Sequence, residues 1–159
     1  MPDVKYLKLS GKSQGLISAN CSTIDSIGNR YQDNHKDQIQ VLSVNYNISR
    51  MQNASHHPIL IVKPVDKSSP LLGVAVANNE ILDAEFSFYR INQSGQLEKY
   101  FEIKLTKAMI VDFSQSFPDG PVDSHIVSHE KILLQYESIS WRHILAGTSG
   151  YSINEKNIF

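Results

Sequence analysis

The sequence predicts a mainly β protein, an antiparallel two-sheet β-barrel with one short flanking α-helix. Three observations support this. Apolar and polar residues alternate along several segments, a single segment carries the start and stop signals of a helix, and residues 28–38 are polar without any period. With 159 residues the chain has the size of one domain, so we expect 1–159 to form a single unit.

Alternation with a period of two marks the expected strands. Three of them are "VKYLKL" (4–9), "QVLSVNYNI" (40–48) and "AEFSFYRI" (84–91). In "YFEIKLTKAMIVDFSQSF" (100–117) one face carries Phe101, Ile103, Leu105, Met109, Val111, Phe113 and Phe117. This segment is long for one strand, so we expect a bend or two strands in the same phase. A hairpin centred on 92–95 joins it to the preceding strand.

The last predicted strand, "EKILLQYESISWRHIL" (130–145), changes phase. Ile132, Leu134 and Tyr136 share one parity, whereas Ile139, Trp141 and Leu145 share the other. A shift of one residue predicts a bulge near Glu137 and Ser138, where the chain passes from one sheet to the other.

The predicted helix starts at Ser69, a good N-cap, followed by Pro70 at the favoured first helical position. "LLGVAVA" follows, and Asn78–Asn79 ends it. Its apolar residues run nearly all round, so we expect it to pack against a sheet or a neighbouring subunit.

Composition excludes several classes of protein. The net charge of −1 without a basic run argues against a nucleic-acid partner. A single cysteine, Cys21, excludes an internal disulfide and predicts a small buried side chain. The N-terminus lacks the basic and apolar parts of a secretory signal peptide, and no apolar run reaches the ~20 residues that cross a bilayer. We therefore expect a cytoplasmic protein without membrane insertion.

The histidines do not define a metal or cofactor site. Neighbours on a strand point to opposite faces, so His56 and His57 cannot both bind one metal. His125 and His129 would share a face on a strand, but zinc needs three or four converging ligands. A small hydrolase that uses His125, His129 and a carboxylate stays a rival hypothesis without positive support.

Two short motifs resemble catalytic signatures but fail on spacing. "GKS" (11–13) would need a further glycine where Tyr6 stands, and "GTSGY" (147–151) has Gly150 one residue too early for a nucleophile elbow. We predict no catalytic residue. Residues 146–159 are interpreted as a flexible or docking tail.

Three segments together carry a family resemblance. "VDKSSPLL" (65–72), "AEFSFYRINQSGQLEKYFEIKLTKAMIV" (84–111) and "HIVSHEKILLQYESISW" (125–141) occur in the order and at the spacing of one family. The chain resembles the haemolysin-coregulated proteins (Hcp) of type VI secretion systems over about 4–143.

The resemblance implies a structural role without enzymatic activity. Members form homohexameric rings, and the rings stack into a tube that a contractile sheath expels together with a spike protein. Small effector proteins travel in the lumen. Export by expulsion of the tube would explain why a signal peptide is unnecessary: the protein would be cytoplasmic first and then secreted.

The resemblance also assigns a role to the polar loop 28–38, the family's extended loop. Arg30, Asp33 and Lys36 are predicted to make reversible contacts between stacked rings. Tyr100 and Ile110, apolar residues on the polar face of their strand, are predicted in subunit contacts. The main alternative is a monomeric β-barrel binding or adaptor module, which would use the same strands without forming a ring.

Overall fold

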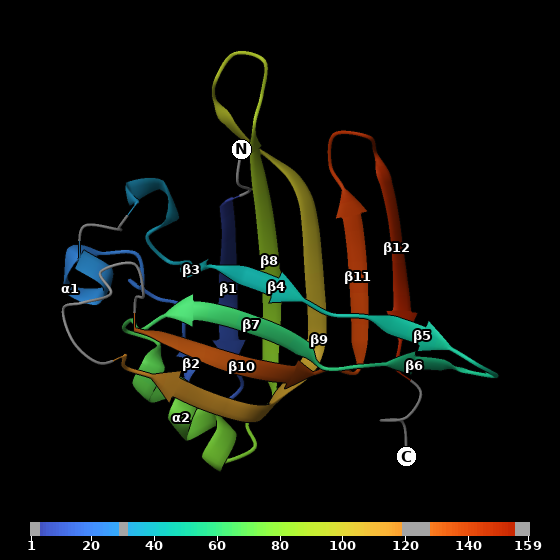
Figure 1. Cartoon of the computed structure of the whole chain (residues 1–159), viewed down its shortest axis with the longest axis horizontal. Coiled ribbons are helices and arrows are strands. Elements are labelled where there is room, and N and C mark those ends of the chain that lie inside the picture. The colour runs from blue at the N-terminus through green and yellow to red at the C-terminus, as the bar shows by residue number, and fades with distance from the viewer. Residues whose placement is uncertain (1–3, 29–31, 119–127, 155–159) are drawn as a thin grey trace.

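A computed structural model of the chain describes residues 4–28, 32–118 and 128–154 and consists of two antiparallel sheets flanked by a helix (Figure 1). The described strands are β1 (Val4–Gly11), β2 (Gly15–Leu16), β3 (Ile39–Val41), β4 (Ser43–Asn45), β5 (Ile48–Arg50), β6 (Ala54–His56), β7 (Ile59–Pro64), β8 (Leu82–Ile91), β9 (Leu97–Ser116), β10 (His129–Gln135), β11 (Ser138–His143) and β12 (Thr148–Ile153). The helices are α1 (Ile24–Ile27), the 3-10 helix η2 (Asp33–His35) and α2 (Ser69–Ala77). The mainly β, two-sheet prediction with a flanking helix is confirmed.

One long strand, β9, belongs to both sheets. Its first half pairs with β8 and β11, and β12 completes this sheet beyond β11 while β1 lies on the other side of β8. Its second half pairs with β10, which is followed in order by β7 and β4. β3 pairs with β1, and a single residue, Leu42, separates β3 from β4. Segment 39–45 therefore links the two sheets on the side away from β9.

β9 contains the predicted bend, but the alternation of buried and exposed residues does not keep the same phase across the bend. Lys107 has a φ of 50°, and the pairing with β8 shifts register close to this residue. Leu105 is buried before the bend, and Ala108 and Ile110 are buried after it. The extra residue at the bulge reverses the faces of the residues after it, until a second register shift, in the pairing with β10, places Phe113 opposite the buried Ile132 and so back on the core face.

This phase change corrects two predictions. Val111, predicted on the core face, is 48% exposed. Ile110, predicted in a subunit contact, is 4% exposed and belongs to the hydrophobic core.

The phase change before β11 is confirmed. Tyr136 and Ile139 are both buried, although their parities differ. Between them the backbone N–H of Glu137 donates to the carbonyl of Thr106 at 3.1 Å, beside the bend of β9. The chain thereby leaves one sheet and enters the other, as the sequence pattern predicts.

Helix α2 begins one residue earlier than predicted. Ser68 is the N-cap residue, Ser69 is the first helical residue, and Asn78 follows the end. The hydroxyl of Ser69 is occupied elsewhere: it accepts from the N–H of Asp66 at 3.0 Å and donates to Glu130 at 2.8 Å. The four-residue helix α1 was not predicted, because so short a helix leaves no periodic pattern.

A buried ion cluster ties the start of α2 to the second sheet. The side chains of Lys63, Asp66 and Glu130 have no exposed surface, and the Lys63 ammonium pairs with both carboxylates, at 3.0 Å from Asp66. Gln115 on β9 donates to the other oxygen of Glu130 at 2.7 Å. Buried charges are tolerated when they are paired and hydrogen-bonded in this way.

The "GKS" stretch forms a turn held by a carboxylate. Glu80 accepts from the backbone N–H groups of Ser13 at 3.0 Å and Gln14 at 2.9 Å. Burial alone would raise the pKa of Glu80, but these bonds and one from the Gln14 side chain lower it. A Cβ at Gly11 would overlap with the Glu80 carboxylate, so a larger residue there would displace Glu80 from the turn.

Part of the predicted tail is a strand. Within 146–159, residues 148–153 form β12, which pairs with β11 along its whole length. Its side chains are mostly small or polar and exposed, and the alternation of Tyr151 and Ile153 is too short a pattern to predict a strand. In the part of the chain that the structure describes, no helix is long and apolar enough to cross a membrane.

Candidate assembly surface

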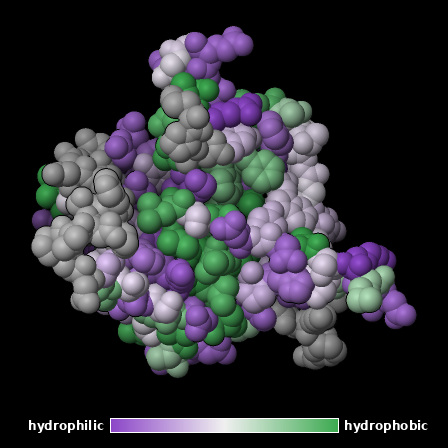
Figure 2. Space-filling model, in the orientation of Figure 1, coloured by the Kyte–Doolittle hydropathy of each residue, from purple (hydrophilic) through white to green (hydrophobic). Residues whose placement is uncertain are grey.

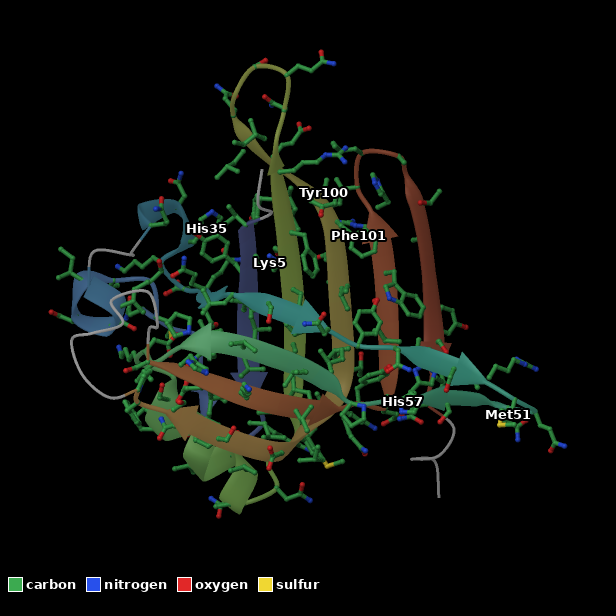
Figure 3. The ribbon with its side chains drawn as sticks, viewed as in Figure 1. Lys5, His35, Met51, His57, Tyr100 and Phe101 are labelled. Atoms are coloured by element: carbon green, nitrogen blue, oxygen red, sulfur yellow. The ribbon has the colours of Figure 1, made fainter. Side chains whose placement is uncertain are left out.

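The hairpin of β5 and β6 stands apart from the two sheets. Ile48 pairs with His56 and Arg50 with Ala54, but this ladder joins none of the other described strands. Figure 1 shows the hairpin extending beyond the end of β12, and Figure 3 places Met51 at its tip. Met51 is 98% exposed. An isolated two-stranded hairpin is marginally stable in water, so its orientation depends on the contacts at its base.

Two of those contacts come from His56, at the end of β6. Its side chain is buried, with Nδ1 2.7 Å from the hydroxyl of Tyr136 and Nε2 2.9 Å from the hydroxyl of Ser152. The imidazole also meets the Tyr136 ring edge-on, at 5.4 Å between centroids. His56 thus joins the hairpin to the junction of β10 and β11 and to β12.

His57 points the other way, as predicted for neighbours on a strand. It is exposed, and its Nε2 lies 2.9 Å from the hydroxyl of Ser49 on β5. Its backbone N–H donates to the carbonyl of Asn47 at 3.2 Å. His57 therefore makes contacts only within the base of the hairpin.

The groups around His56 favour its neutral form. Burial lowers the pKa of His56 and raises that of Tyr136 to about 12. One ring nitrogen of a neutral imidazole donates and the other accepts, and both hydroxyls can take either part. The three side chains satisfy one another without a charge.

The surface beside the hairpin is partly apolar. Tyr151 and Ile153 on the edge strand β12 are 75% and 45% exposed. A hollow between hairpin and edge strand is lined by Arg50, Asn53, Ala54, Tyr151, Ser152 and Ile153. This hollow is open to solvent and has no acidic residue in its lining.

A second apolar region covers the outer face of β7 and β10. Leu60 and Leu133 lie opposite each other on these strands and are half-buried, as is Val62. Figure 2 shows hydrophobic side chains gathered in the middle of the viewed face, where these strands cross in Figure 1. Contiguous exposed apolar surface of this kind is typical of protein interfaces.

The described part of loop 28–38 is anchored to the first sheet. The ring of His35 stacks on Tyr6 with 3.8 Å between centroids and meets Tyr89 edge-on at 5.0 Å. The carboxylate of Asp37 accepts from the backbone N–H of Asn20 at 3.0 Å. His35 is therefore held on β1 and β8, and Asp37 is held against the backbone at Asn20.

The three residues predicted to stack rings differ in where the structure places them. Arg30 lies outside the described residues, Asp33 is the first residue of η2, and Lys36 is exposed just after η2. The structure brings Lys36 to the surface but does not test a contact between rings.

A charged network lies on the outer face of the first sheet. Glu102 is 4% exposed and pairs with Arg142 at 3.1 Å and Lys99 at 3.3 Å. Hydrogen bonding to Glu102 and burial raise the pKa of Glu85, whereas burial would raise that of Glu102 but the bond from Glu85 and the lysines lower it. A proton therefore binds more readily to Glu85 than to Glu102.

The described residues give no arrangement of side chains that supports the rival enzyme hypothesis. His125 lies outside the described residues, and His129 begins β10, next to Glu130 of the ion cluster. The described residues hold no group of three histidine, cysteine or acidic side chains able to bind a metal. Burial, with a contribution from Asp66, raises the pKa of Cys21 to about 12, so its thiol stays protonated.

Comparisons with known proteins identify the class. The family model described as "Type VI secretion system effector, Hcp" matches residues 6–143. The "Major exported protein" of Pseudomonas aeruginosa is 34% identical over 157 residues, which cover 91% of each chain. The uncharacterized protein YhhZ of Escherichia coli is 39% identical over 149 residues, 93% of this chain. The chain spans only 37% of the length of YhhZ.

Solved structures agree with this class. The secreted protein Hcp3 from Pseudomonas aeruginosa has a TM-score of 0.87 and 35% identity, over 96% of this chain and 98% of that one. Another Hcp crystal structure has a TM-score of 0.91 and 30% identity with the same coverage. The matched region includes both sheets and α2, so the chain shares the fold of these Hcp structures. The chain belongs to the Hcp family.

Proposed function

We propose that the chain is the tube subunit of a type VI secretion system. Identical copies form a homohexameric ring, and the rings stack into a tube that a contractile sheath and a spike protein carry out of the cell. Small effectors occupy the lumen. Membership of the Hcp family, matched over residues 6–143, is the observation that carries this proposal.

The surface of the chain supports contacts between copies. A closed ring of identical subunits requires head-to-tail contacts between two different patches of each subunit. The hairpin tip, the edge strand β12 and the apolar face of β7 and β10 expose side chains that a neighbouring copy would cover. A chain with several such regions is better suited to an assembly of copies than to a monomeric state.

The alternative, a monomeric binding module, has less support. A small barrel that binds a ligand needs room inside. Here the inward residues of both sheets form one packed cluster that includes the fully buried rings of Phe86 and Tyr136. The described hollows lie on the outside of the molecule and are open to solvent.

Ring stacking is assigned to loop 28–38. The anchoring of His35 on Tyr6 would hold the neighbouring, exposed Lys36 in a constant position for the next ring. Arg30, Asp33 and Lys36 are the proposed contacts. Reversible polar contacts suit a tube that has to come apart after export.

Negative-stain imaging of purified protein tests both ring formation and ring stacking. Single rings with sixfold end views are expected, together with stacks at high concentration. Replacing Arg30 and Asp33 by alanine should leave the rings and shorten the stacks. Unchanged stack lengths would contradict the loop assignment, and the absence of rings at every concentration would favour the monomeric module.

Export is tested in cells that contain the secretion system. The chain should accumulate in the medium when the sheath contracts and stay inside when the sheath is deleted. Equal amounts in the medium of both strains would contradict export through the tube.

A further inference from the structure

We propose that His56 is a positioning residue that holds the β5–β6 hairpin as a contact arm toward a second copy of the chain. The proposal rests on the self-assembly proposed above. It adds the means by which one flexible element would be kept in the orientation that a neighbour recognises.

The hairpin can serve as an arm because it lies outside both sheets. Its ladder ends at Arg50 and Ala54, and the fully exposed Met51 follows. Arg50 is exposed as well and is the only lysine, arginine or acidic residue within 43–58. The tip therefore offers a thioether and a guanidinium, which suit an apolar and acidic patch of a neighbour.

One side chain, His56, makes two long-range contacts at the base of the arm. β5 and β6 receive no ladder hydrogen bonds from the other described strands, so the orientation of the tip depends on the connections to the paired strands β4 and β7 and on polar contacts at the base. His56 supplies two of them, to partners that lie 80 and 96 residues further along the chain. Figure 3 shows the base of the hairpin next to the lower ends of β11 and β12, with Met51 at the far end.

The two hydrogen bonds of His56 do what apolar packing would not do: they fix a direction. A leucine at this position could fill the space, but it would leave the hydroxyls of Tyr136 and Ser152 without the imidazole between them. A directional bridge fixes an angle, whereas apolar contact tolerates many. Small changes at the base are amplified at the tip, so loss of the bridge should disturb assembly more than folding.

The test removes the two hydroxyls that bond His56 and leaves the imidazole of His56 in place. Tyr136→Phe and Ser152→Ala delete only the two hydroxyls, so the fold is expected to persist. The matched control is His57→Ala, which removes the exposed bond to Ser49 in the same hairpin. His56→Gln keeps one donor and one acceptor and should restore part of what His56→Ala loses.

The first readout is tryptic cleavage after Arg50, followed by mass spectrometry of fragments 1–50 and 51–159. Cleavage should be about tenfold faster in the double variant and unchanged in the control, because losing one or two hydrogen bonds opens the hairpin by about that factor. Equal cleavage rates in wild type and double variant would overturn the proposal.

The second readout is the dissociation constant between copies, from light scattering over a dilution series. It should rise about tenfold in the double variant and stay constant in the control. Faster cleavage with an unchanged dissociation constant would overturn the arm's part in assembly. A wild-type protein that stays monomeric would refute the tube function, while the cleavage rates still decide whether His56 holds the hairpin.

Discussion

The hairpin of β5 and β6 and the strand β7 follow each other in the chain but depend on different forces. β7 lies between β10 and β4, and its inward residues Ile59 and Ile61 are fully buried in the core. The hairpin has one buried side chain, His56, and its remaining residues face solvent or each other. Changes in β7 should therefore act on the free energy of unfolding, and changes in the hairpin on assembly.

The largest effect is expected at the buried ion cluster beside β7. Lys63→Ala leaves the Asp66 and Glu130 carboxylates buried without their cation, which should cost about 3–5 kcal/mol in the free energy of unfolding. Urea unfolding measures this cost. Lys107→Ala, at an exposed pair with Glu137, is the control and should change the free energy by less than about 1 kcal/mol. Similar values for both variants would contradict the assigned role of the cluster.

A smaller effect separates the two adjacent histidines. His56→Ala removes the imidazole that bonds the buried hydroxyl of Tyr136 and should cost about 1–3 kcal/mol. His57→Ala removes an exposed bond and should cost at most about 0.5 kcal/mol. Thermal or urea unfolding of both variants checks the difference. An equal loss in the two would mean that His56 is not the anchor of the hairpin.

The pH dependence of stability sharpens the comparison. The folded-state pKa of His56 lies below the ordinary value of 6.5 because of burial. As the pH falls through 6.5 the unfolded chain takes up the proton first, so this contribution to stability is complete above 6.5 and is lost toward lower pH. His56→Gln should remove this part of the decline. Urea unfolding of wild type, His56→Gln and His57→Gln at about pH 7.5 and about pH 5.5 measures it. Parallel declines in all three would contradict the assignment.

The smallest effect on stability is expected at the tip. Met51→Asp should change the free energy of unfolding by less than about 0.5 kcal/mol, because the side chain is exposed. The same substitution should weaken association, since it places a carboxylate where an apolar contact is proposed. Light scattering at fixed concentration and urea unfolding of the same sample report the two quantities. Loss of stability without loss of association would reverse the account of this region.

Most of the fold could be predicted from residues that alternate against one core. The passage from β10 to β11 was visible because Tyr136 and Ile139 differ in parity while both are apolar. The equivalent passage within β9 was hidden. Met109 and Val111 stay apolar on the outer face after the bend, and Phe113 is back on the core face beyond the second register shift, so polarity does not mark the reversal.

The assembly surface was harder to predict. Parity showed that His56 and His57 face opposite ways, but not which one is buried, because its partners Tyr136 and Ser152 are distant in sequence. β12 is not predicted, since Tyr151 and Ile153 are its two alternating apolar residues and two positions are too few to mark a strand. Surfaces that a neighbour covers leave little pattern in a single chain.

The most direct test of the proposed tube function is the mass of the purified protein, measured by light scattering across a concentration series. The account predicts a species of six subunits that persists on dilution to the dissociation constant of the ring. A mass of one subunit, 17.9 kDa, at every concentration would contradict it.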